Sequence, residues 1–215
     1  MSLPIAIRSP HILDVYDESG MCSQGVHQAW YTTRWQQQAG CGPANCAQIM
    51  WYLSQTKPSL NTLVPYDCSQ KSQMLSFMKD IWAFVTPGRM GVNRLSTFTN
   101  GALAYAQSSG LTLAQHTLSI PTRSSDRPDA GAMITFIAQA LSADLPVAFL
   151  NLSNGALHNL DNWHWVTLIA IDPASGCAQM IDQGRKALLD LPLWLRTTRI
   201  GGGFVVLAPE SALID

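Results

Sequence analysis

The chain has 215 residues, of which 47% are hydrophobic and 13% charged, and its formal net charge is −1. This composition predicts a compact globular protein, with a single domain over residues 1–215. The 13 Lys and Arg residues are scattered and form no basic run, which argues against a nucleic-acid partner. No stretch approaches about 18 consecutive apolar residues and no export signal is visible, so we expect a cytoplasmic protein that does not span a membrane.

The cysteines give no sign of a disulfide framework. Their number is odd and no two of them have the CxxC spacing of a zinc knuckle; they are Cys22, Cys41, Cys46, Cys68 and Cys177. A zinc site built from Cys41, Cys46 and His164 would match no common ligand spacing. We therefore expect reduced thiols, no metal and no organic cofactor.

The first part of the chain is dominated by helical patterns. Gly42-Pro43 places a proline near a first helical turn, and the almost uniformly apolar run ANCAQIMWYLSQ that follows is typical of a buried helix. Apolar residues at helical spacing predict three further helices, over residues 73–84, 95–108 and 131–143. The polar segment 119–129, with two prolines and two arginines, is predicted to be a loop.

The last part of the chain is strand-like. Short apolar runs bounded by turn residues predict four strands, near residues 145–152, 163–171, 177–182 and 204–209. Helices followed by strands indicate an α+β fold with a mostly antiparallel sheet. Asp172-Pro173 and Gly176 lie between the second and third strands and are typical of a hairpin turn.

This hairpin brings a histidine to an acid. If it is regular, Ile171 lies opposite Cys177, and counting back along both strands places Val166 opposite Asp182. His164 then becomes a diagonal neighbour of Asp182 on the same face, because strand side chains alternate. A β-bulge in either strand would move one of the two side chains to the other face. A regular hairpin therefore predicts an imidazole oriented by a carboxylate.

Cys41 is the candidate nucleophile for this pair. It follows the polar turn QQQAG and precedes Gly-Pro at a helix start, where unpaired N–H groups and the helix dipole stabilise a thiolate. The thiolate would attack an acyl carbon and His164 would later protonate the leaving group. Asp182 would fix the imidazole tautomer.

Acyl transfer also requires donors for the oxyanion that forms in the transition state. The backbone N–H of Cys41 is one candidate, and a side-chain amide just upstream is the second. Three glutamines stand there. We prefer Gln36, and Gln38 remains the alternative although it is very close to the thiol along the chain.

These motifs resemble a known family. QQQAGCGPANCAQIMWYL is similar to the nucleophile motif of bacterial papain-like cysteine peptidases related to the double-glycine (bacteriocin-processing) leader peptidases, in which Gln precedes a Cys-Gly-Pro helix start. HWVTLIAIDPASGCAQMID, followed by a Leu-Trp segment and FVVLAP, is similar to the family's His-strand, turn and Asp-strand. The resemblance implies a papain-like fold, with Cys41 on a helical half and His164 and Asp182 on a sheet half. Residues 61–144 match no part of this pattern.

The expected function is a cysteine peptidase-like hydrolase that cleaves an amide or thioester in a peptide or small substrate. Two alternatives remain open: an acyltransferase or peptide-ligating enzyme similar to phytochelatin synthase, and a non-catalytic binding module that keeps the fold. Each residue also has a structural alternative. Cys41 could be a buried thiol, His164 a packed core histidine and Asp182 the start of a turn. The sequence specifies neither the substrate nor the oligomeric state.

Overall fold

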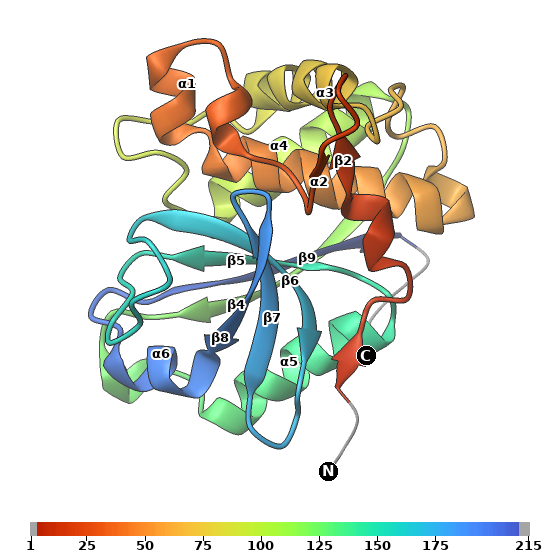
Figure 1. Cartoon of the computed structure of the whole chain (residues 1–215). Helices are drawn as coiled ribbons and strands as arrows, with labels where there is room; N and C mark the ends of the chain where they lie inside the picture. The colour runs from red at the N-terminus through yellow and green to blue at the C-terminus, as the bar shows by residue number, and fades with distance from the viewer. Residues whose placement is uncertain (1–3, 211–215) are drawn as a thin grey trace.

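The computed structural model describes residues 4–210 and consists of helices packed on both sides of an antiparallel sheet (Figure 1). Its helices are α1 (Arg34–Ala39), α2 (Cys41–Thr56), α3 (Lys71–Phe84), α4 (Leu95–Ser108), α5 (Ala130–Ser142) and α6 (Leu191–Thr197). Figure 1 shows α1 to α4 together on one side of the sheet and α5 on the other. The predicted combination of helices with a mostly antiparallel sheet is confirmed. No helix within the described residues is long and apolar enough to cross a membrane.

The sheet runs through the middle of the molecule. Its longer strands are β4 (Leu113–Ile120), β5 (Val147–Asn151), β6 (His164–Ile171), β7 (Cys177–Asp182), β8 (Arg185–Asp190) and β9 (Gly202–Pro209). Their order in space is β4-β9-β5-β6-β7-β8, and the short strand β1 (Ile5–Ala6) also pairs with β6. A separate small pair is formed by β2 (Val15–Tyr16) and β3 (Cys22–Ser23).

The four predicted helices are all present, as α2, α3, α4 and α5. The polar segment before Cys41 was expected to be a turn, and this is wrong because most of it is helix α1. The Thr33 hydroxyl caps this helix by accepting a hydrogen bond from the Gln36 N–H. Helix α6 was also not predicted; it begins after Asp190, whose carboxylate accepts from the Leu193 N–H.

The four predicted strands correspond to β5, β6, β7 and β9, whereas β4 and β8 were not predicted. Strand β4 includes Ser119 and Ile120, so the loop predicted over 119–129 begins too early. From Ala114 to Ser119 this edge strand alternates half-buried and exposed residues, and it pairs with β9 along its whole length. Segment 113–120 therefore forms a strand mainly because it pairs with β9, about ninety residues further along the chain, and its local sequence contributes less.

The β6–β7 hairpin reaches the predicted register in an unexpected way. Near the turn, Ile171 pairs with Ala178 instead of Cys177, so the prediction there is wrong by one residue. A β-bulge in β6 takes up the difference, and beyond it Thr167 pairs with Ile181, as the predicted register requires. The two departures cancel at the end of the hairpin that carries His164 and Asp182.

Helix α2 lies against α3 and β6 and is buried from its first residue to Ser54. Gly42 permits close approach at its N-terminus, because a Cβ there would lie 2.7 Å from the side chain of Val92. The buried amides of Asn45 and Gln48 both contact the hydroxyl of Thr167 on β6. Packing on these sides fixes the position of the helix start relative to the sheet.

Asp144 connects the N-terminal segment to the far end of α2. Its Oδ1 accepts hydrogen bonds from the Arg8 N–H at 2.7 Å and from the Tyr52 hydroxyl at 2.6 Å. Its Oδ2 lies 3.7 Å from Lys57 Nζ. The residue is buried and has a φ of 60°, a left-handed conformation that Asp and Asn adopt more readily than most other residues.

Replacement of this carboxylate should destabilise the protein. Asp144→Ala is expected to lower the free energy of unfolding by about 3 kcal/mol, because the Tyr52 hydroxyl and the Arg8 N–H lose their acceptor. Asp144→Asn keeps an acceptor and tolerates the left-handed backbone, so it should cost about half as much or less. Urea unfolding, followed by tryptophan fluorescence, measures the free energy of unfolding of both variants. Equal losses in the two would contradict the role given to these hydrogen bonds.

Candidate active site

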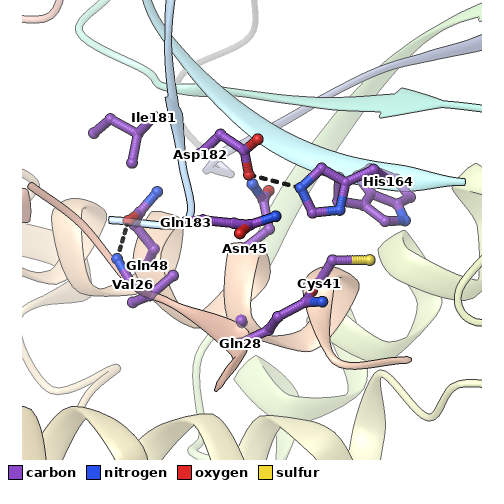
Figure 2. A pocket seen from close by; sticks show the side chains of 11 residues that line it. Val26, Gln28, Cys41, Asn45, Gln48, His164, Ile181, Asp182 and Gln183 are labelled. Carbon is purple, nitrogen blue, oxygen red and sulfur yellow. Dashed lines mark hydrogen bonds and ion pairs between the residues drawn. The ribbon is translucent and has the colours of Figure 1, made fainter. Parts of the chain in front are cut away.

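Three of the predicted site residues meet at one end of the sheet. Cys41 is the first residue of α2, His164 the first residue of β6 and Asp182 the last residue of β7. All three line the same small cavity (Figure 2). The structure therefore brings together a thiol, an imidazole and a carboxylate from segments that are far apart in the sequence.

His164 and Asp182 form a short hydrogen bond, with 2.6 Å between His164 Nε2 and Asp182 Oδ1. Because an ionised carboxylate only accepts, Nε2 carries a proton and donates it, and Nδ1 is the ring nitrogen left for another partner. Asp182 also begins the tight β7–β8 turn, in which Gln183 and Gly184 both have positive φ. Asp182 therefore lies both at the start of a turn and within hydrogen-bond distance of the imidazole.

The Cys41 sulfur lies beneath the imidazole, on the side away from Asp182 (Figure 2). Its Sγ is 4.0 Å from the carbonyl oxygen of Trp163, the residue that precedes the imidazole in the chain. Trp163 has a φ of 56°, which is uncommon for a bulky residue and is found where surrounding structure imposes it. This unusual backbone conformation directly precedes His164, the first residue of β6.

The imidazole is held in its charged form. Burial by itself lowers the pKa of His164, but the hydrogen bond to Asp182 and the interaction with Cys41 outweigh it and raise the pKa to about 10. A positive imidazolium beside a thiol favours the thiolate as its counter-ion. The site is therefore suited to an ion pair between the two catalytic candidates.

The other cysteines have different surroundings. Cys46 and Cys68 are fully buried, and burial raises the pKa of each thiol. Cys22 is exposed and Cys177 is half-buried, and neither lines the cavity. Within residues 4–210 no group of three or more His, Cys, Asp and Glu side chains could hold a metal ion. Among the thiols in the described chain, Cys41 is the one placed beside the imidazole.

The structure does not place Gln36 at the cavity. Gln36 lies on α1, where its Oε1 accepts a hydrogen bond from the Thr33 hydroxyl at 3.1 Å, and Gln38 is exposed. Neither residue is part of the cavity lining. The prediction that Gln36 lies at the oxyanion position is wrong, because residues 34–39 form helix α1 and its side-chain amides do not line the cavity.

Gln28 supplies the upstream amide that lines the cavity. It begins a short 3-10 helix, Gln28–Trp30, and its Oε1 is buried without a hydrogen-bond partner among the described residues. Two contacts fix this turn. The His27 ring accepts from the Ala29 N–H at 3.0 Å, and Gln37 Nε2 donates to the carbonyl of Tyr31 at 2.7 Å. The middle glutamine of the QQQ run therefore positions Gln28 indirectly.

Asn45 is a second cavity residue that the sequence analysis did not identify. It follows Cys41 by one helical turn, and its buried Oδ1 has no hydrogen-bond partner within the described part of the chain. The spacing of four residues on a helix could have pointed to it, because such residues share a face. Gln28 offered no such signal, since its place depends on the path of the intervening chain.

The cavity is small. Its volume of about 20 Å³ is enough for one water-sized group, such as the carbonyl oxygen of a substrate. The lining combines the thiol and the imidazole with neutral amides and a few apolar side chains. A nucleophile, an oriented base and side-chain amides around such a space are compatible with acyl transfer.

Comparison with known proteins finds no matching family and no similar curated protein. The resemblance of the sequence motifs to papain-like peptidases thus has no support from these comparisons. The chemistry of the site must be inferred from its geometry.

The proton on His164 provides a direct test of this geometry. NMR of histidine-labelled protein should show His164 protonated well above pH 6.5 and losing its proton near pH 10. A raised pKa in the folded state means that the His164 charge stabilises the fold fully below about pH 6.5 and that this contribution is lost as the pH approaches 10. Cys41→Ala and Asp182→Asn should each lower the midpoint. A wild-type midpoint at or below 6.5 would contradict the proposed ion pair.

Proposed function

We propose that this chain is a papain-like, cysteine-dependent hydrolase that cleaves an amide or thioester through a thioacyl intermediate on Cys41. The observation that carries the proposal is the arrangement of thiol, imidazole and carboxylate around one cavity, with a bond of 2.6 Å between His164 and Asp182. A buried histidine that served packing alone would not need an acid on one side and a thiol on the other.

In the first half of the reaction, the Cys41 thiolate attacks the carbonyl carbon and the carbonyl oxygen becomes an oxyanion. The backbone N–H of Cys41 and the side-chain amide of Gln28 are the proposed donors to this oxyanion. The His164 imidazolium then gives its proton to the leaving amine or thiol, and the carbon–nitrogen or carbon–sulfur bond breaks. The products of this half are the thioester on Cys41 and the free leaving group.

In the second half, neutral His164 takes a proton from water, and the resulting hydroxide equivalent attacks the thioester carbon. The Cys41 thiolate leaves and the acid product is released, so that the imidazolium–thiolate pair is restored. Asp182 keeps the same ring nitrogen protonated in both halves through its hydrogen bond. It therefore acts on orientation and charge without itself gaining a proton.

A larger groove next to the cavity supports a peptide-sized substrate. Leu150 lines this groove and pairs across the sheet with Trp165, which lines the catalytic cavity. The groove has a volume of about 590 Å³, within the range of ligand-binding pockets. Its polar lining is mostly uncharged, with Arg94 as the one charged residue among the groups that form it.

The two glutamines allow a sharp test of this proposal. With p-nitrophenyl acetate as acyl donor, we expect a burst of p-nitrophenol that disappears in Cys41→Ala. Gln28→Ala should slow acylation by about 100-fold, the effect of losing one oxyanion donor, while Gln36→Ala should leave the rate unchanged. Stopped-flow absorbance measures the burst, and mass spectrometry locates the acetyl group. A burst that persists in Cys41→Ala, or an acetyl group on another residue, would refute the assignment.

A further inference from the structure

A chain of buried hydrogen bonds connects β6 to the catalytic cavity through α2. Gln48 Nε2 lies 2.7 Å and Asn45 Nδ2 lies 2.8 Å from the hydroxyl oxygen of Thr167. The three side chains are at most 4% exposed. Among the described residues, these two amides are the hydrogen-bond contacts of the Thr167 hydroxyl.

The direction of the first bond in this chain is fixed by the backbone. The Val26 N–H donates to Gln48 Oε1 at 2.8 Å, so the amide oxygen of Gln48 faces Val26. Its NH₂ group must then be the end that donates to Thr167. The Thr167 hydroxyl accepts this bond and still has one proton of its own to donate.

That proton determines the orientation of Asn45. With Asn45 Nδ2 toward Thr167, the hydroxyl proton has no acceptor, and the buried Oδ1 of Asn45 faces the cavity without a partner. Rotating the amide by half a turn exchanges its oxygen and nitrogen without changing its shape. Thr167 then donates to Asn45 Oδ1, and the NH₂ group of Asn45 points into the cavity. This orientation satisfies both groups, as buried polar groups generally require.

We propose that Asn45 is a positioning residue whose NH₂ group donates to the Asp182 carboxylate, directly or through one water molecule. Asp182 Oδ1 holds His164, while Oδ2 has no hydrogen-bond partner in the described part of the chain. Figure 2 shows the Asn45 side chain rising from α2 toward the Asp182–His164 pair, and all three line the same water-sized cavity. A donor at this point would hold the carboxylate oriented toward the imidazole.

The expected effect of Asn45 on kcat rests on the proposed function. The orientation of the Asn45 amide does not depend on it. Asp182 on β7 and Cys41 on α2 are the titratable groups that act on His164, so a change at Asn45 reaches the imidazole through Asp182. The effect should therefore be visible in the free protein, before any substrate binds.

Two variants at position 45 test the proposal. Asn45→Leu removes the donor at similar volume and is expected to lower the midpoint of His164 proton loss by about 0.5 to 1 pH unit in NMR titrations. It should also lower kcat for p-nitrophenyl acetate by about tenfold with KM unchanged. Asn45→Asp keeps an acceptor for Thr167 but presents only acceptors to the cavity, so its kcat should fall at least as far as that of Asn45→Leu.

Ser54→Ala is the matched control, because Ser54 is a buried polar residue of the same helix that bonds to the Trp51 carbonyl and does not line the cavity. It should leave the His164 midpoint and kcat unchanged. An unchanged midpoint in Asn45→Leu would overturn the proposal, and so would wild-type kcat in Asn45→Asp, since the cavity-facing atom would then be an acceptor. If Asn45→Leu does not fold, the kcat of Asn45→Asp alone tests the proposal.

The two proposals can fail separately. A wild-type protein that shows no burst would refute the hydrolase while the NMR midpoint still reports on Asn45.

Discussion

The hydrogen bond between His164 and Asp182 is the constraint on which the site depends. It requires β6 and β7 to be in one register, because a slip of one residue would turn either side chain to the opposite face of the sheet. The hairpin meets this requirement with a longer turn and a compensating bulge. The bulge therefore determines the geometry of this pair, since without it the carboxylate would point away from the imidazole.

The second constraint is the placement of α2. Its start must lie against the first residues of β6. The burial of the helix on nearly all sides and the glycine at position 42 achieve this. The polar contacts to Thr167 add direction to this packing. A helix held in this way can present Cys41 at a fixed point, which is what an acyl-transfer site needs more than flexibility.

The catalytic candidates could be predicted because each has a strong local signal. Cys41 stands before Gly-Pro and a buried helix, and His164 and Asp182 lie on two strands joined by a recognisable turn. The proximity of His164 and Asp182 followed from strand alternation, although the bulge that makes it possible could not be seen in the sequence. A bulge depends on the packing of neighbouring strands, and the residue types in β6 do not indicate one.

The remaining parts of the site depended on the path of the chain. Gln28 reaches the cavity because a 3-10 turn is held by His27 and Gln37, contacts that no spacing rule anticipates. The prediction for Gln36 assumed a turn where the chain forms helix α1. Strand β4 is likewise defined by its distant partner β9. The wrong predictions therefore have two sources: local caps and turns, such as the Thr33 cap of α1, and the pairing of β4 with a strand far away in the sequence.

The rate at which Cys41 is alkylated by iodoacetamide across pH tests the central claim most directly. Because the imidazolium supports the thiolate, Cys41 should react at pH 6 about 100-fold faster than the exposed Cys22, as measured by peptide mass spectrometry. This preference should be lost in His164→Ala. Equal rates for the two cysteines at pH 6, or a Cys41 rate that is unaffected by His164→Ala, would contradict the account.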